Sequence, residues 1–340
     1  MNVSERPGVY TSYEVSSSIA AYGSGGAVGL AAESISGQEG VCTAVSSYAE
    51  ALSAFGGGAM TELVRVLLLN GAPLVYCVSV GKGGYQTAID TLMGVPAVKF
   101  MVCGSRSESV HAMMKSALTT ADENSKYRIG ILESSRTDRA GLVSAAQALG
   151  SEKLVLVSHH ETKGTPGSVA AAMCGILASR DDPALPVNGA VLTGLGEVSG
   201  NFSDGDITLL VRGGVTPIEC VSGEVSVIRG ITTRSESGGV PDATWRELST
   251  VLVVNSVIPQ IRDSLRAKFA RAKNNAQTRG AIRTQVIIQL EENLNREYID
   301  SYGDVSVQPG GEDGSVCVVG FSFTVAHGLN RIELHADVSI

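Results

Sequence analysis

The sequence has few aromatic residues and lacks the features of several protein classes. Aromatic side chains make up 5% of the 340 residues. No apolar run of about 18 residues exists, so the sequence predicts no membrane insertion. The first residues, MNVSERPGVY, lack the apolar core of a secretory signal peptide. We therefore expect a protein that is made in the cytoplasm and either stays there or leaves by cell lysis.

The net charge and the positions of the cysteines exclude further classes of protein. The formal net charge is −8, which argues against a general surface for direct nucleic-acid binding. No cysteine belongs to a Cys-x-x-Cys pair, and most have small or apolar neighbours. This pattern is typical of reduced, buried thiols rather than of a disulfide framework or a zinc site. The six cysteines are Cys42, Cys77, Cys103, Cys174, Cys220 and Cys317.

Motifs for common enzymatic chemistry are also missing. GKGG at 81–84 lacks the phosphate-loop spacing, GLGEVSG at 194–200 lacks the third glycine of a dinucleotide-binding turn, and no nucleophile elbow is present. His159, His160 and Glu161 follow a strand-like run, where doubly wound folds place ligands. Neighbouring strand residues point to opposite faces, so both imidazoles cannot easily bind one ion. We expect a surface loop and no cofactor; the alternative is a soluble cytoplasmic α/β enzyme with its site near His159 and His160.

Residues 97–180 alternate between strand-like and helix-like patterns. Short apolar runs predict strands, and segments with helical spacing predict helices. Three successive βα units favour a mostly parallel sheet covered by helices. The strands are expected at 97–104, 127–134 and 153–160, and the helices at 107–124, 138–150 and 167–180.

The pattern changes after about residue 206. A hairpin is predicted to turn near Ser222 and Gly223. Thr244 and Glu247 have the spacing of a capping box for a following helix, which Pro259 is expected to kink or restart. The end of the chain is rich in strand patterns. The sequence therefore predicts a mixed α/β fold, with a central doubly wound-like α/β domain and an α+β C-terminal domain.

Residues 262–283 carry a concentrated positive charge. Asp263 is the only acidic residue among them, so the stretch is +6 and the rest of the chain is −14. This favours an acidic partner; nucleic acid is less favoured, because no aromatic residues interleave. The alternative is a solvated helix face neutralised by Glu291, Glu292, Glu297 and Asp300. The basic residues are Arg262, Arg266, Lys268, Arg271, Lys273, Arg279 and Arg283.

Both ends of the chain show strict alternation of apolar and polar residues, which is typical of strands with one buried face. An unpaired strand exposes N–H and C=O groups, and adding it to a neighbour's sheet satisfies them. Ten residues of strand span roughly 33 Å, enough to reach an adjacent subunit. The last strand pairing within its own subunit remains the alternative. The alternating residues are Val9, Thr11, Tyr13 and Val15 at one end and Ile332, Leu334, Ala336, Val338 and Ile340 at the other.

Several motifs, in this order, resemble those of contractile tail sheath proteins of bacteriophages and R-type bacteriocins. They are RPGVY (6–10), NGAPLVYCVSVG (70–81), GGVTPIE (213–219), VIRGITT (227–233), WRELSTVLVVNSVIPQIRDSLRAKF (245–269), RGAIRTQVIIQLE (279–291) and FTVAHGLNRIELHADVSI (323–340). Each motif is moderately specific, and their order along the whole chain carries the resemblance. The chain is short for the family, so we expect no extra outer domains.

The resemblance implies a structural subunit and not an enzyme. It implies a helical homo-oligomer of stacked rings around a tail tube protein, in contact with baseplate and tail terminator proteins. Subunits would rotate as rigid bodies on contraction and drive the tube through the target cell envelope. The particle, a virion or a bacteriocin, would assemble in the host bacterial cytoplasm and be released by lysis.

The resemblance also assigns regions of the chain. It implies an N-terminal arm at 1–22, an outward-facing α/β domain at 23–235, a tube-facing domain at 236–324 and a C-terminal arm at 325–340. The arms would exchange strands with neighbouring subunits and bury Val9, Thr11, Tyr13, Val15, Ile332, Leu334, Val338 and Ile340. The residues expected to face the tube in the extended state are Arg266, Lys268, Arg271 and Lys273.

Overall fold

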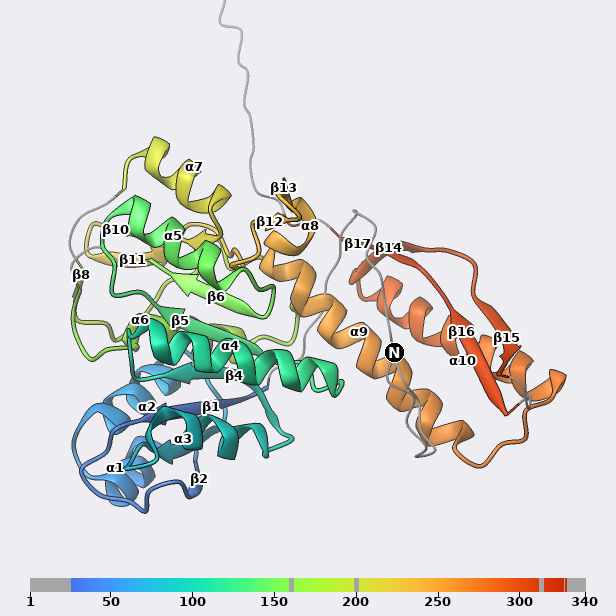
Figure 1. The fold of residues 1–340 in the computed structure, drawn as a ribbon, viewed down its shortest axis with the longest axis horizontal. Coiled ribbons are helices and arrows are strands. Elements are labelled where there is room, and N and C mark those ends of the chain that lie inside the picture. Colours follow the sequence, from blue (N-terminus) through green and yellow to red (C-terminus); the bar gives the residue numbers. More distant parts are fainter. Residues whose placement is uncertain (1–25, 159–161, 199–201, 312–314, 327, 329–340) are drawn as a thin grey trace, which may run out of the picture.

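The computed structural model describes residues 26–158, 162–198, 202–311, 315–326 and 328. A seven-stranded sheet forms its largest element, with the order β2-β3-β1-β4-β5-β6-β9 (Figure 1). All neighbouring strands are parallel except β2 and β3, which are antiparallel. The strands are β1 Ala27–Ala32, β2 Cys42–Val45, β3 Val75–Ser79, β4 Val98–Cys103, β5 Ile129–Glu133, β6 Leu154–Val157 and β9 Val215–Thr216.

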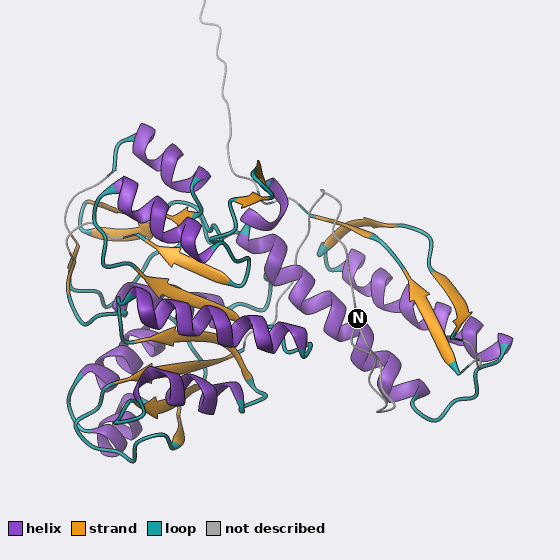
Figure 2. Cartoon of the chain, in the orientation of Figure 1, coloured by secondary structure: helices purple, strands orange, loops and turns teal. Residues whose placement is uncertain are grey.

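Helices cover both faces of this sheet (Figure 2). One face packs against α1 (Tyr48–Phe55), α2 (Ala59–Leu69) and α6 (Ser168–Ser179). The other packs against α3 (Gly84–Met93), α4 (Glu108–Glu123), α5 (Arg139–Leu149) and α7 (Asp204–Arg212). The predicted parallel sheet between helical layers is confirmed.

The side chains of a single strand divide between the two cores. Val155 and Val157 belong to the core with α2 and α6, whereas Leu154 and Leu156 belong to the other. This follows from the two-residue period of a strand, which sends successive side chains to opposite faces. All four are fully buried, as expected for a central parallel strand with helices on both sides.

The predicted turns and helix ends are mostly confirmed. Helix α5 ends at Gly150, whose φ of 48° is left-handed, a conformation that favours glycine. The hairpin of β10 (Ile218–Val221) and β11 (Glu224–Val227) turns at Ser222 and Gly223, which both have positive φ. Two smaller pairs are β7 (Thr162–Lys163) with β8 (Glu197–Val198) and β12 (Glu236–Ser237) with β13 (Val240–Pro241).

The helix start predicted from Thr244 and Glu247 is wrong. Asp242 is the N-cap of α8 (Ala243–Arg246), and its carboxylate accepts hydrogen bonds from the amides of Thr244 and Trp245. Glu247 lies between α8 and α9 and pairs instead with Arg229, with 2.5 Å between Oε1 and Nη2. Glu247 therefore pairs with a residue 18 positions away, and the cap of α8 comes from Asp242.

Helix α9 (Leu248–Phe269) belongs to two hydrophobic cores. Leu248, Val251 and Leu252 pack into a core of the α/β body. Val253, Val257, Ile261 and Leu265 pack into a separate core with the C-terminal elements. The helix runs through Pro259 without interruption, so the predicted restart is wrong. Burial of both faces offsets the roughly 3 kcal/mol that an internal proline costs.

The C-terminal elements form the third core. Helix α10 (Ala276–Asn295) packs against α9, and four short strands pack beside it (Figure 1). The strands form two antiparallel pairs, β14 (Ile299–Tyr302) with β17 (Phe323–Val325) and β15 (Ser306–Gly310) with β16 (Val316–Gly320). The C-terminal elements thus have the predicted α+β composition, with helices and antiparallel strands.

Polar groups join α9 to the α/β body where the two cores meet. The buried Lys153 ammonium lies 3.0 Å from Asp122 Oδ1 and 3.3 Å from Asn255 Oδ1 of α9. Arg262 of α9 donates a 3.0 Å hydrogen bond to the carbonyl of Ser125. Both cations lie over the ring of Tyr127, at 5.5 Å for Lys153 Nζ and 5.8 Å for Arg262 Cζ. These contacts fix the direction in which α9 leaves the α/β body.

Candidate interaction surfaces

The four residues predicted to face a tube are exposed along one short segment. Arg266 and Lys268 lie in the last turn of α9, and Arg271 and Lys273 lie in the loop before α10. Cations at a helix C-terminus are stabilised by the helix dipole. Lys268 donates a hydrogen bond to the side-chain oxygen of Gln285 on α10.

The other three basic side chains of the stretch bond within the subunit. Arg262 turns toward Ser125 and Tyr127, as described above. Arg279 donates to Asn274 Oδ1 and Arg283 to the carbonyl of Val305, both at 2.9 Å. In the described structure, four of the seven cations therefore bond within the subunit, Lys268 among them, whereas Arg266, Arg271 and Lys273 are exposed at the surface.

The four acids proposed to neutralise this stretch do not pair with it. Glu292 pairs with Arg296 at 2.7 Å, and Glu291 accepts a hydrogen bond from the Tyr302 hydroxyl. Among the described residues, no ion pair joins residues 262–283 to Glu291, Glu292, Glu297 or Asp300. The alternative of a solvated helix face neutralised by these acids therefore stays a prediction.

The basic loop lies beside an exposed apolar strand. Asn274 Nδ2 donates a 2.9 Å hydrogen bond to the carbonyl of Val316 in β16. Val316 and Val318 alternate with half-buried residues and are 47% and 54% exposed. We call Arg266, Lys268, Arg271, Lys273, Val316 and Val318 the basic tip. It combines positive charge with exposed apolar area, which suits a protein partner with an acidic surface.

The residues predicted to form exchanged arms lie outside the described part of the chain. These are Val9, Thr11, Tyr13, Val15, Ile332, Leu334, Val338 and Ile340. The C-terminal elements do offer strand edges. Within the described residues, β14 pairs only with β17 and β15 only with β16, so each pair leaves two edges without a strand partner. Such edges accept added strands.

The candidate enzymatic residues His159 and His160 also lie outside the described residues. The preceding Ser158 is buried, and its hydroxyl accepts a 3.3 Å hydrogen bond from the Ile218 amide. In the described ranges, no group of three His, Cys, Asp or Glu side chains is placed to hold a metal ion. None of the helices in these ranges has the length and apolar composition needed to cross a bilayer.

The cysteines are free thiols, as predicted. Cys77, Cys103 and Cys174 are buried, and Cys42, Cys220 and Cys317 are half-buried. Burial raises the pKa of Cys103 to about 12, so this thiol stays protonated and unreactive at neutral pH.

Sequence reasoning missed a buried ion pair at the carboxyl edge of the sheet. The Glu133 side chain, fully buried at the end of β5, lies 2.5 Å from Arg106 Nε. Its other oxygen accepts a 2.8 Å hydrogen bond from the Val169 amide. It thereby caps α6, whose N-cap residue Gly167 has no side chain to do so. This position is where a doubly wound fold places ligands, but here the carboxylate links β5, α6 and the loop after β4.

Comparisons with known proteins bear on the whole chain. Residues 240–339 match the model of the phage tail sheath C-terminal domain. No curated protein sequence matches the chain.

Solved structures share its fold. The helical sheath of the anti-feeding prophage in its contracted state is 16% identical, with a TM-score of 0.75 over 99% of this chain and 100% of that one. A chain of the six-fold symmetrised baseplate of the same particle is 17% identical, with a TM-score of 0.74 over 99% and 100%. A sheath tail protein of Desulfitobacterium hafniense is 11% identical, with a TM-score of 0.69 over 94% and 100%. Because the sequence identities are this low, these similarities show a shared fold and nothing more.

Proposed function

Because residues 240–339 match a phage tail sheath C-terminal domain in a chain that has the tail sheath fold throughout, we propose that this protein is the structural subunit of a contractile tail sheath. It polymerises as stacked rings around a tail tube and contracts to drive the tube through the target cell envelope. The observation that carries the proposal is the agreement of two independent findings, the domain match and the full-length fold.

The proposed particle is a phage tail or an R-type bacteriocin, assembled in the host cytoplasm and released by lysis. Its other partners are the tube, baseplate and tail terminator proteins. Support for a baseplate contact comes from the likeness to a chain in the anti-feeding prophage baseplate. The subunit has no catalytic role in this scheme.

Strand exchange is the proposed link between subunits. Residues 1–22 and 325–340 act as arms that add to strand edges of neighbours. In support, β14, β15, β16 and β17 each have one edge without a strand partner among the described residues. Each backbone hydrogen bond contributes about 0.5–1.5 kcal/mol, so one added strand supplies several kcal/mol before apolar burial. Such links hold the lattice together while the compact bodies rotate.

The basic tip is the proposed contact with the tube, in a subunit whose residues 23–235 face outward and 236–324 face the tube. Its cations are exposed, and exposed ion pairs contribute only about 0–1 kcal/mol each. Weak contacts of this kind suit an interface that must separate when the sheath contracts.

The arm is tested by placing two new acids on one predicted face of the last strand. Leu334→Asp with Val338→Asp introduces charge on the apolar face, whereas His335→Asp with Ser339→Asp introduces the same charge on the polar face. Electron microscopy of purified protein should show tubes or rings for the native chain and the polar-face control, and only small particles for the apolar-face variant. Removing residues 329–340 should also prevent polymerisation while the remaining chain stays folded. Sheaths formed by that truncated chain would overturn strand exchange.

The tube contact is tested by reversing charge at two positions. Arg266→Glu with Lys273→Glu should weaken extended assembly on the tube, because like charges then face an acidic partner. Arg212→Glu with Lys126→Glu makes the same change in net charge at exposed sites of the α/β body. Tube-loaded sheaths counted in micrographs are the measurement. Equal loading by both variants would refute the role of the basic tip, while leaving polymerisation itself intact.

A further inference from the structure

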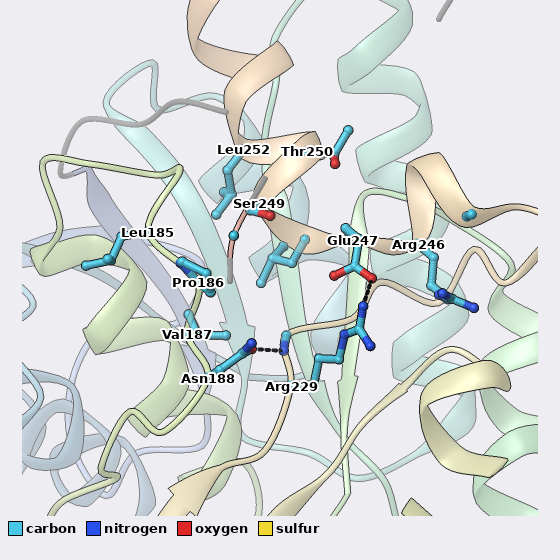
Figure 3. A pocket seen from close by; sticks show the side chains of 14 residues that line it. Leu185, Pro186, Val187, Asn188, Arg229, Arg246, Glu247, Ser249, Thr250 and Leu252 are labelled. Atoms are coloured by element: carbon cyan, nitrogen blue, oxygen red, sulfur yellow. Dashed lines mark hydrogen bonds and ion pairs between the residues drawn. The ribbon is translucent and has the colours of Figure 1, made fainter. Parts of the chain in front are cut away.

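A pocket lies where the α/β body meets the start of α9. Figure 3 shows Leu185, Pro186 and Val187 along one side of it, with Ser249 and Leu252 of α9 next to them. The pocket is distinct from the basic tip, which lies at the other end of α9. Its volume is about 250 Å³, and its walls come from residues 185–188, 229–230 and 243–252 together with Gly328.

The chain returns to this pocket after the last described strand. Strand β17 ends at Val325 among the C-terminal elements, yet Gly328 already lines the pocket, against the loop that follows α6. A Cβ on residue 328 would lie only 2.3 Å from Pro186 Cγ, a separation that Cβ atoms in proteins essentially never show. The backbone of Gly328 therefore lies directly on the Pro186 ring, and only glycine allows this approach. Residues 329–340, which lie outside the described part of the chain, thus start from the pocket.

Leu329, the next residue, is out of phase with the alternation of the segment that follows. Ile332 and Leu334 begin its apolar series, which recurs at every second position. Leu329 is three positions before Ile332, so in one continuous strand it would lie on the polar face with Arg331 and Glu333. We therefore expect the side chain of Leu329 to be buried somewhere other than on the apolar face of the arm.

The pocket offers apolar walls for this side chain. Val187, Leu248 and Leu252 are buried around it, whereas Leu185, which also lines it, is 56% exposed. The exposed part of Leu185 is apolar area that a further side chain can remove from water. A cavity of about 150 Å³ accepts a benzene molecule, so a pocket of about 250 Å³ has room for a leucine side chain. Consecutive Cα atoms are about 3.8 Å apart, so Leu329 begins beside these walls.

We propose that Leu329 docks into this pocket of its own subunit and anchors the C-terminal segment there. The arm that exchanges with a neighbour then begins at Asn330, and its eleven residues span roughly 36 Å. This consequence rests on the proposed strand exchange, whereas the docking of Leu329 does not. The anchor ties the arm to the α/β body and to the start of α9, so a pull on the arm acts on these elements and not on β17 alone.

Disulfide trapping in the full chain tests the docking. Leu329→Cys is combined with Leu185→Cys or with Ser249→Cys, which place the second thiol on two different walls of the pocket. Mild oxidation should link residue 329 to at least one of them, because linked Cα atoms must lie within about 7 Å of each other. Leu329→Cys with Leu209→Cys, an exposed position on α7, is the matched control and should give no link. Mass spectrometry of the digested protein distinguishes these links from any that involve the native cysteines.

A mixture of isotope-labelled and unlabelled protein shows which subunit supplies the segment. A link within one subunit joins peptides of the same label, whereas links between subunits also join peptides of different label. We expect links of the same label only. In the chain with Leu329→Cys and Leu185→Cys, Gly328→Ala adds the Cβ that meets Pro186 and should abolish the link.

The stability of the unassembled protein gives a second measurement. Leu329→Ala should lower its melting temperature by roughly 2–4 °C, because most of a buried leucine side chain is removed. Leu334→Ala is the matched control on the apolar face of the arm. It should leave the melting temperature unchanged, because in the proposed exchange that side chain is buried only against a neighbour.

Three results would overturn the proposal. The first is no link from residue 329 to either wall of the pocket. The second is links of different label, which would assign the pocket to the arm of a second copy. The third is equal melting temperatures for the native chain and Leu329→Ala. Sheath formation is a separate measurement: a chain that links within its own subunit but never forms sheaths would refute the proposed function and leave the anchor, and sheaths without the link would refute only the anchor.

Discussion

The aromatic ring of Tyr127 should stabilise the junction between α9 and the α/β body through two cations. Lys153 Nζ lies 5.5 Å from the ring centroid and Arg262 Cζ lies 5.8 Å from it. Their side chains are only 3% and 18% exposed, so water screens these contacts weakly. A cation over a ring contributes about 0.5–2 kcal/mol, more when desolvated, so the two contacts together should contribute about 2 kcal/mol.

A pair of substitutions measures the contribution of the cation–ring contacts to stability. Tyr127→Phe keeps the ring and removes the hydroxyl, whereas Tyr127→Leu removes both. We expect Tyr127→Leu to be less stable than Tyr127→Phe by about 2 kcal/mol. At an unfolding entropy of about 2.1 cal/mol/K per residue, this corresponds to a melting temperature lower by roughly 3 °C for a chain of 340 residues. Urea unfolding followed by tryptophan fluorescence is a suitable assay, because the only tryptophan, Trp245, lies in α8, directly before α9.

A second comparison tests whether the ring of Tyr127 stabilises the protein through its contact with Arg262. Arg262→Met should cost less in the Tyr127→Leu background than in the native one, because the ring contact is already lost there. Its hydrogen bond to the Ser125 carbonyl is lost in both backgrounds and cancels. If Tyr127→Leu and Tyr127→Phe agree within about 0.5 kcal/mol, the usual limit of additivity, the cation contacts contribute nothing and the reasoning fails.

Three further predictions concern the α/β body. Gly175→Ala should destabilise the protein by about 1–3 kcal/mol, because its Cβ would lie 2.6 Å from the Leu67 carbonyl oxygen of α2. Glu133→Gln should cost about 3–5 kcal/mol in urea unfolding, because it leaves the Arg106 cation without its buried counter-charge. Burial lowers the pKa of His111, so the unfolded state takes up a proton first as pH falls below about 6.5. The contribution of this histidine should thus be complete above that pH and be lost below it, by at most about 1.4 kcal/mol per pH unit, and His111→Asn should flatten that slope.

Matched controls exist for these variants. Gly280→Ala in α10 places a Cβ in open space and should be neutral or stabilising by up to about 1 kcal/mol. Glu108→Gln breaks an exposed ion pair with Arg136 and should cost at most about 1 kcal/mol. Costs as large as those of the buried positions would contradict the packing argument. A native pH profile identical to that of His111→Asn between pH 7 and 5 would remove His111 from the account.

Local pattern was sufficient for the βα units of the α/β body. The apolar run at 153–160 contains β6, and the helical spacing at 138–150 contains α5, which ends at the predicted glycine. These elements were predictable because each is set by short-range properties, namely side-chain period, strand length and the conformational freedom of glycine.

Local pattern failed where a distant partner competed with a neighbour. Thr244 and Glu247 have capping-box spacing, but Asp242 caps α8 and Arg229 takes the Glu247 carboxylate. Pro259 should interrupt a helix, yet α9 continues because Val257 and Ile261 on either side of it are buried in the C-terminal core. Neither outcome can be read from residue spacing, because the deciding contacts are made across the fold.

By itself, the amino-acid sequence determined the class of the fold, the absence of common catalytic motifs and the concentration of positive charge at 262–283. Only the tertiary structure decided which cations make internal contacts and which remain at the surface. It also decided that one helix contributes to two hydrophobic cores. The physical reason is that period and composition act over a few residues, whereas burial and ion pairing depend on segments that meet only after the chain has folded.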